Sequence, residues 1–428
     1  MKNKIKSVIA VLAAAAMLSG CGGNPGTVTS ADTEGTLADV ISDTTSITGE
    51  TQEIDFSALS EEEIRQLMVE RSLMTVGNTA RMEKALKKAE NGEEITVAYI
   101  GGSITEGLTA GAELCWAKLT YNWLCEQYPH TKINYVNAGM SGTPSTLGNI
   151  RSDRDVLSHG EPDIIFIEFA VNDAGDTKSR QNYESLVRKM LKLDKETAVV
   201  LLFTVIKSGY TCEEHMSKVG EYYDLPMISL NNVLAPEFEA GRMTWEDYSD
   251  DESHPNEWGH ELVAEMIENY YKKVMEIMKN GTGDKETAEI PAETLNGADF
   301  TAMKLLDRTS ITPNSLGSWA DKETLAQFPN GWEFGKSGGN EPISFTISCN
   351  TLYVIFRAQD SARLGTIDVY VDGEKVMDVK ANMSTGWNNP ETQWIFGGGE
   401  TKEHLIEIKM AEGYEDSYFW LLGFGYCD

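Results

Sequence analysis

Between residues 94 and 280, short apolar runs alternate with segments of helical period. The apolar runs predict β-strands, and the amphipathic segments predict α-helices. The strands are expected at 95–100, 132–137, 163–169 and 198–206, and the helices at about 178–192, 212–223 and 258–279. The strand runs are apolar throughout, which is typical of parallel strands that are covered on both faces. This alternation predicts an α/β domain built on a parallel sheet.

The pattern changes after Asn280, and from about residue 290 the helical period is weak. Strand patterns are found instead at 351–356, 366–371 and 404–410, and Asp372-Gly373 has the composition of a tight hairpin turn. Five of the nine tryptophans fall in this part: Trp319, Trp332, Trp387, Trp394 and Trp420. We therefore expect an all-β sandwich over residues 288–428. For each tryptophan a place in the core is favoured, and stacking on a sugar ring is the alternative.

The N-terminal end has the pattern of an export signal. Lys2, Lys4 and Lys6 precede eleven apolar residues, 8–18. A run of eleven suits a signal peptide, because a membrane span needs about 20 residues. The residues that follow end in Cys21 and resemble the lipobox of bacterial lipoproteins, in which the signal is removed before the cysteine and the cysteine is acylated. The alternative is an ordinary secretory signal with a cysteine there by chance.

We therefore expect a signal peptide over residues 1–20 and a tether over 21–55. Residues 22–55 are rich in threonine and acidic residues, contain no lysine or arginine, and carry apolar residues without period. That composition is typical of disorder. The folded part is expected over 56–282, opening with a helix whose capping box is formed by Ser60 and Glu63.

Charge and cysteine content exclude several classes of protein. The formal charge is 36 − 67 = −31, which argues against binding nucleic acid or docking electrostatically on anionic lipid. Apart from Cys21, the five cysteines are sparse and lack CxxC spacing. Neither a zinc site nor a disulfide scaffold is expected.

Four polar blocks follow one another in positions suited to a catalytic crevice. Ser103 follows two glycines directly after the first strand, and Gly142 and Asn172 lie in the loops after the next two strands. In open α/β sheets the ligand crevice lies at the carboxyl ends of strands. The fourth block holds Asp251 and His254, three residues apart, so that the carboxylate can orient the imidazole toward Ser103.

Each block alone is typical of an ordinary loop. His260 has Glu257 three residues before it, and we expect that pair to be a solvated or capping pair on the last helix. The α/β part, residues 94–280, has no G-x-S-x-G elbow, and the chain has no HExxH motif, which argues against an α/β-hydrolase elbow and a zincin.

Taken in order, the four blocks resemble those of the SGNH branch of the GDSL esterases, over about residues 94–278. The resemblance implies a flavodoxin-like three-layer α/β/α domain. It also implies that Ser103 is the nucleophile and that Asp251 and His254 complete the triad. The Ser103 backbone N–H, Gly142 and Asn172 would form the oxyanion hole. One departure is that Gly-Gly-Ser replaces the usual Gly-Asp-Ser.

An SGNH domain joined to a β-sandwich is similar to bacterial carbohydrate O-acetyl esterases. The resemblance implies a serine esterase that removes small acyl groups, above all acetyl, from an oligo- or polysaccharide. No metal or organic cofactor is expected. A lipid anchor would hold the chain on the exported face of the cell membrane. Two alternatives stay open: a lysophospholipase or thioesterase of the same fold, and a catalytically silent glycan-binding surface lipoprotein.

Overall fold

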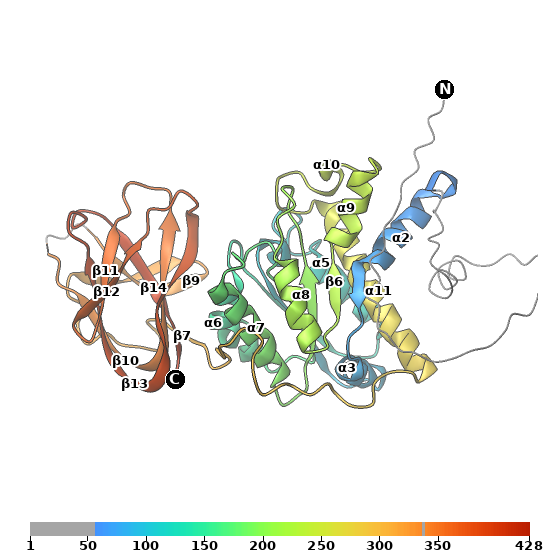
Figure 1. Cartoon of the computed structure of the whole chain (residues 1–428), viewed down its shortest axis with the longest axis horizontal. Coiled ribbons are helices and arrows are strands. Elements are labelled where there is room, and N and C mark those ends of the chain that lie inside the picture. The colour runs from blue at the N-terminus through green and yellow to red at the C-terminus, as the bar shows by residue number, and fades with distance from the viewer. Residues whose placement is uncertain (1–55, 336–338) are drawn as a thin grey trace, which may run out of the picture.

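The computed structural model describes residues 56–335 and 339–428, which form an α/β domain and a β domain (Figure 1). The expected signal peptide (1–20), the tether (21–55) and Cys21 lie outside the described residues. None of the described helices is both long and apolar enough to cross a membrane.

The α/β domain is built on a six-stranded sheet in the order β1-β6-β5-β4-β2-β3. Its strands are β1 (Leu73–Thr75), β2 (Ile95–Gly101), β3 (Ile133–Gly139), β4 (Ile164–Glu168), β5 (Ala198–Phe203) and β6 (Met227–Ser229). Strands β2 to β6 are parallel, as predicted, whereas the edge strand β1 pairs antiparallel with β6. The sequence pattern missed β1 and β6 because each is only three residues long.

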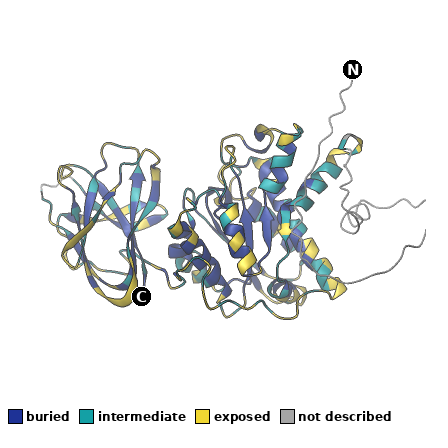
Figure 2. Ribbon diagram, in the orientation of Figure 1, coloured by how far each residue is buried: buried dark blue, intermediate teal, exposed yellow. Residues whose placement is uncertain are grey.

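Helices cover both faces of this sheet. They are α2 (Glu61–Ser72), α3 (Ala80–Glu90), α4 (Ser103–Glu106), α5 (Trp116–Gln127), α6 (Ser145–Asp155), α7 (Thr177–Leu191), α8 (Glu213–Tyr222), α9 (Asn231–Glu239), α10 (Trp245–Tyr248) and α11 (Glu257–Asn280), with short 3-10 turns η1 (Phe56–Ala58) and η2 (Leu157–His159). Helices α3, α5 and α11 share one core with the sheet, and α7 and α8 share the other. The strands are buried while the outer sides of the helices are exposed (Figure 2). The predicted three-layer α/β/α class is confirmed.

The β domain is an eight-stranded antiparallel sheet in the order β12-β11-β13-β10-β14-β9-β8, with β7 paired to β14. The strands are β7 (Lys304–Leu306), β8 (Trp319–Leu325), β9 (Phe328–Phe334), β10 (Ile343–Gln359), β11 (Thr366–Val371), β12 (Glu374–Lys380), β13 (Trp387–Met410) and β14 (Phe419–Cys427). Its two ends meet in one core, since Ile367 and Val379 lie in the same cluster as Trp332 and Phe334. The predicted all-β domain is confirmed, but its layers share the long strands β10 and β13, whose pairing shifts register near Cys349.

The β domain packs on helices α6 and α7 of the α/β domain (Figure 1). A small apolar cluster fills the junction, with Leu147 and Ile150 from α6 meeting Tyr353 and Leu422 from the β domain. Polar contacts fix the junction at two further points. The Asn182 side chain donates a hydrogen bond of 2.8 Å to the Tyr353 hydroxyl, and the Lys178 ammonium lies 3.6 Å from the centre of the Trp394 ring. The β domain is thereby held beside the loop that joins β3 to α6.

The five tryptophans of the β domain do not share one role. Trp319 and Trp332 are buried in its core, as the sequence favoured. Trp394 and Trp420 are half-buried against the junction cluster. Trp387 is 54% exposed.

Candidate active site

The turn after β2 presents Ser103 at the carboxyl edge of the sheet. A β-carbon at Gly101 would come within 2.2 Å of the Thr105 hydroxyl and 2.5 Å of the Glu168 carbonyl oxygen, so only glycine fits there. The chain then enters the short helix α4, whose first residue is Ser103. Ser103 is only 7% exposed, so its hydroxyl is shielded from bulk water on most sides.

The structure brings Ser103, His254 and Asp251 into one hydrogen-bonded chain. The His254 Nε2 atom lies 2.9 Å from the Ser103 Oγ atom, and the His254 Nδ1 atom lies 2.7 Å from the Asp251 carboxylate. A base within hydrogen-bond reach of a hydroxyl, itself oriented by a third group, is the arrangement that activates a nucleophilic serine.

A compact loop before α11 holds the acid–base pair of this chain. The second oxygen of Asp251 accepts hydrogen bonds from the backbone N–H groups of Ser253 and His254, at 2.6 and 2.7 Å. Partial burial works against ionisation, but the hydrogen bonds from the His254 ring and from these backbone groups outweigh it and hold the pKa of Asp251 below its ordinary value. Asp251 is therefore ionised at neutral pH and keeps the His254 ring oriented.

A buried carboxylate supports the turn that carries Ser103. Glu168 ends β4, is fully buried, and accepts hydrogen bonds from the hydroxyls of Thr105 (2.9 Å) and Thr204 (2.6 Å). Burial raises the pKa of Glu168, while these hydroxyls and the Gly102 backbone N–H lower it in part. Sequence reasoning missed Glu168 because it reads as the last residue of an apolar strand.

The loop after β3 carries Gly142, the first predicted oxyanion donor. The backbone N–H of Ser141 donates a hydrogen bond of 2.7 Å to Glu106, and the N–H of Met140 donates one of 3.0 Å to the Gly101 carbonyl, so the loop is tied to the nucleophile turn. Gly142 itself has φ = +67°, which a side chain disfavours. The ring of the exposed Trp387 lies against Gly142, and its nearest atom would be 2.2 Å from a β-carbon at this position.

Asn172, the second predicted donor, packs directly on the nucleophile turn. A β-carbon at Gly102 would come within 2.2 Å of the Asn172 Oδ1 atom, which is buried and has no hydrogen-bond partner. A side chain at residue 102 would therefore have to displace the Asn172 side chain from the place it occupies here.

A buried arginine beneath the loops was also missed by sequence reasoning. The Arg151 guanidinium, on α6, donates to the carbonyls of Ala138 (2.7 Å) and Gly101 (3.1 Å) and pairs with Asp155 at 2.9 Å. It is fully buried and joins the ends of β2 and β3 just before the two site loops. No sequence signal marked it, because helix α6 was not predicted.

One expectation about the last helix is wrong. His260 is not a solvated or capping partner of Glu257: it is fully buried, and its Nδ1 atom accepts a hydrogen bond of 3.2 Å from the Trp116 backbone N–H. Burial lowers the pKa of His260 to about 4. The cause of the error is that α11 packs this face on α5, which the local spacing of charges did not reveal.

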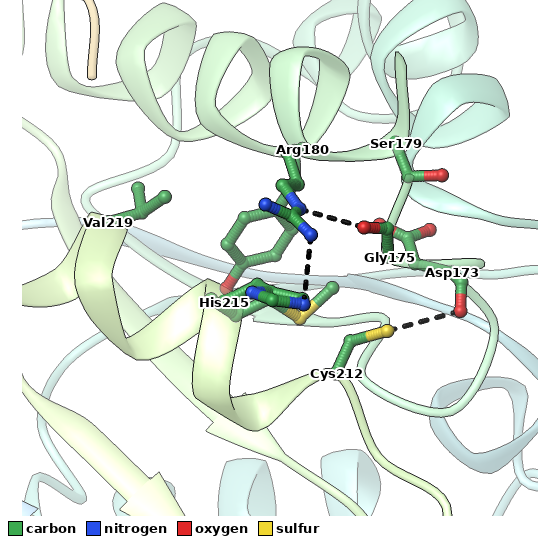
Figure 3. Close-up of a pocket in the computed structure, with 9 residues that line it drawn as sticks. Asp173, Gly175, Ser179, Arg180, Cys212, His215 and Val219 are labelled. Carbon is green, nitrogen blue, oxygen red and sulfur yellow. Dashed lines mark hydrogen bonds between the residues drawn. The ribbon is translucent and has the colours of Figure 1, made fainter. Parts of the chain in front are cut away.

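A cavity of about 10 Å³ lies between α7 and α8 (Figure 3). Asp173, Tyr183 and Cys212 are among the residues that line it. Its volume is about that of one water molecule, so it is not a substrate site. Among residues 56–335 and 339–428, no group of three or more His, Cys, Asp or Glu side chains is placed to hold a metal ion.

An open α/β sheet with a serine, a histidine and an aspartate joined at its carboxyl edge defines a serine hydrolase of the SGNH type. Residues 99–262, which lie within the α/β domain, match the GDSL-like lipase/acylhydrolase family. The match supports a carboxylic ester hydrolase.

Both domains are found together in a solved esterase. Two structures of a two-domain esterase active on acetylated mannans are similar over 84% of this chain and 98% of theirs. The structure with mannopentaose is 28% identical in sequence, with a TM-score of 0.74, and the other is 27% identical, with a TM-score of 0.75. No curated protein sequence matches the chain.

Proposed function

We propose that this protein is a serine esterase that removes acetyl groups from a carbohydrate. The hydrogen-bonded chain from Ser103 through His254 to Asp251 carries the proposal. Ester hydrolysis requires a nucleophile, a base for its proton and donors for the developing oxyanion, and each has a candidate at the edge of one sheet.

In the proposed reaction His254 takes the Ser103 proton as the Ser103 Oγ atom attacks the ester carbonyl. The negative charge that develops on the carbonyl oxygen is held by the Ser103 backbone N–H, the Gly142 backbone N–H and the Asn172 side-chain amide. His254 returns the proton to the leaving sugar hydroxyl. A water molecule, deprotonated by His254, then hydrolyses the acetyl-enzyme. Asp251 stays ionised throughout and stabilises the imidazolium, which its lowered pKa supports.

A carbohydrate substrate is supported by what stands beside this centre. Trp387 reaches from the β domain to Gly142, and an exposed indole next to a catalytic loop offers an apolar face on which a sugar ring can stack. The two-domain esterase that is similar over most of this chain acts on acetylated mannans. An acetylated mannan is therefore the first substrate to test.

The proposal is tested by acetyl release from acetylated mannan and acetylated xylan, compared with turnover of p-nitrophenyl acetate and of a long-chain p-nitrophenyl ester. We expect turnover of the acetyl esters and little of the long-chain ester. Preference for the long-chain ester would instead support a lysophospholipase or thioesterase. Absence of turnover on every ester would instead support the alternative of a catalytically silent glycan-binding protein.

The contribution of Trp387 is measured in the same assay. Trp387→Ala is expected to raise KM for the acetylated polysaccharide about fivefold, since one aromatic stacking contact is worth about 1 kcal/mol, and to leave p-nitrophenyl acetate turnover unchanged. Trp387→Phe, which keeps an aromatic face, is the matched control. Its KM for the polysaccharide should lie between those of the wild type and Trp387→Ala. An unchanged KM for the polysaccharide in Trp387→Ala would contradict the stacking role.

We further propose that the protein is an exported lipoprotein acylated at Cys21. The basic residues, the apolar run 8–18 and the lipobox support this. Two acyl chains on one cysteine suffice for stable anchoring. Cys21→Ser should move the protein from the detergent phase to the aqueous phase on phase partition, and an unchanged partition would contradict acylation at Cys21.

A further inference from the structure

One buried hydrogen-bonded pair joins the two loops that carry the proposed oxyanion donors. Asp173 follows Asn172 directly, and its carboxylate accepts from both donors of Ser145: the backbone N–H at 2.7 Å and the hydroxyl at 2.6 Å. Ser145 is the first residue of α6 and lies three residues after Gly142. The pair therefore links the Asn172 loop to the Gly142 loop through a single carboxylate.

Within the described part of the chain, Ser145 is the residue whose groups hydrogen-bond to the Asp173 carboxylate. Asp173 is 3% exposed and Ser145 is fully buried, so bulk water does not substitute for either partner. The carboxylate oxygens are both engaged by Ser145 and are not bonded to His254, whose own partner is Asp251. The backbone carbonyl of Asp173 is held separately, by the Cys212 thiol at 3.2 Å (Figure 3) and by the Tyr210 hydroxyl.

We propose that Asp173 is a positioning residue for the oxyanion hole. Its ionised carboxylate sets the distance between the Gly142 and Asn172 donors through its two hydrogen bonds with Ser145. This rests on the proposed esterase function. An ionised carboxylate accepts from both Ser145 donors through charge-assisted hydrogen bonds, whereas a protonated carboxyl is neutral and holds Ser145 through weaker ones. Protonation of Asp173 is therefore expected to loosen one oxyanion loop relative to the other.

The surroundings of Asp173 place this protonation within the working range of an enzyme. Burial raises the pKa of Asp173 to about 7, and the Ser145 hydrogen bonds lower it in part. Repulsion from the nearby carboxylates of Asp176 and Glu168 adds to the increase. The other titratable groups that face this region from the neighbouring elements are Tyr183 and Arg180 on α7, Cys212 before α8 and His215 on α8.

A pH dependence with a definite sign follows. Below about pH 7 Asp173 gains a proton and the oxyanion hole loosens, so kcat/KM should fall with decreasing pH through this group. His254 must also lose its proton to act as the base. With two groups required in their deprotonated forms, the acid limb of kcat/KM should be steeper than a single ionisation allows.

The experiment uses the full chain with p-nitrophenyl acetate and compares Asp173→Asn, Ser145→Ala, the double variant and Asp176→Asn. A small displacement of a catalytic group costs up to about 100-fold in rate, so we expect a 10- to 100-fold loss of kcat in Asp173→Asn with little change in KM. Ser145→Ala should lose less, because its N–H remains. The double variant should be no slower than Asp173→Asn, since both changes break one link.

Asp176→Asn is the matched control. Asp176 caps α7 through the Ser179 N–H at 2.9 Å and does not contact Ser145, so its plateau kcat should equal that of the wild type. In Asp173→Asn the acid limb should return to the slope of one ionisation, which a merely structural role would not produce. Additive losses in the double variant, or an unchanged slope in Asp173→Asn, would overturn the proposal.

The melting temperature of each variant separates unfolding from mispositioning. If Asp173→Asn does not fold, the Ser145→Ala variant and the slope of the wild-type acid limb still decide: a wild-type limb of single-ionisation slope overturns the proposal. Absence of wild-type turnover on any ester would contradict the proposed function itself. If the wild type is active but the kcat losses of Asp173→Asn and Ser145→Ala add in the double variant, only the role of Asp173 is contradicted.

Discussion

Trp387 of the β domain lies against Gly142 of the α/β domain so closely that a β-carbon on Gly142 would come within 2.2 Å of the indole ring. The two residues are far apart in sequence and belong to different domains. Their contact is possible because the junction on α6 and α7 holds the start of β13 over the loop after β3. A loop proposed to bind the oxyanion thus has a neighbouring domain as part of its wall.

We predict that Gly142→Ala lowers kcat on p-nitrophenyl acetate about 100-fold. The new methyl group meets both the positive φ and the Trp387 ring, and displacement of the loop removes the Gly142 donor, whose loss typically costs about 100- to 1,000-fold. The double variant Gly142→Ala, Trp387→Ala separates the two causes. Partial recovery of kcat would assign the loss to the ring, and no recovery would assign it to the backbone conformation.

Loss of the base or the nucleophile should remove almost the whole activity. Ser103→Ala and His254→Ala are each expected to lower kcat by at least about 1,000-fold, because triad members act as a unit. Asp251→Asn should retain more activity than His254→Ala, because Asp251 only orients and stabilises the imidazole. A serine-directed organophosphate should label Ser103, and a label on Ser141 or Ser253 would contradict this assignment.

The glycine at position 102 gives a prediction particular to this chain. Introducing the aspartate that the family usually carries, Gly102→Asp, should push the Asn172 side chain out of place and lower kcat about 100-fold, as the loss of one oxyanion donor does. Asn172→Ala should lower kcat by about the same factor. The double variant Gly102→Asp, Asn172→Ala should lower kcat no further than either single variant. A wild-type kcat in Gly102→Asp would contradict the role of Asn172 as an oxyanion donor in its present position.

The buried His260 should make stability depend on pH. Because its folded pKa of about 4 lies below the unfolded value of about 6.5, the unfolded chain binds more protons in this range. Stability from this group is complete above about pH 6.5 and is lost as the pH falls toward about 4. Between about pH 7 and about pH 5 the loss should be about 2 kcal/mol.

Urea unfolding of the wild type and of His260→Asn at both pH values measures this loss. Asn can still accept the Trp116 N–H but does not titrate, so the variant should show a smaller pH dependence. An equal dependence in both proteins would contradict the assignment to His260.

The strands and helices at the edge of the sheet that carries the candidate site were predictable because their signals are local. The apolar runs became β2 to β5, and the turns after them carry Ser103 and Asn172. The partners that hold the site in place were not predictable in the same way. Glu168, Arg151 and Trp387 act through contacts with residues far away in sequence, and none has a local pattern that separates it from an ordinary strand, helix or loop residue.

The same limit explains the misjudged last helix and the missed strands. His260 reads as surface when only its own helix is considered, and its burial depends on the packing of α11 against α5. Strands β1 and β6, of three residues each, are too short to show a period and exist because an edge of the sheet accepts them. Local patterns thus predicted the elements, while tertiary packing decided the environment of particular side chains.

The position of Trp387 late in the chain has a consequence for the order of assembly. Ser103, Gly142, Asn172 and His254 all precede the β domain, and domains tend to fold as units from the N-terminus. A folding chain can therefore complete its hydrolytic centre before the indole reaches Gly142. During that interval the centre lacks one wall, and its range of esters should narrow only when the second domain docks.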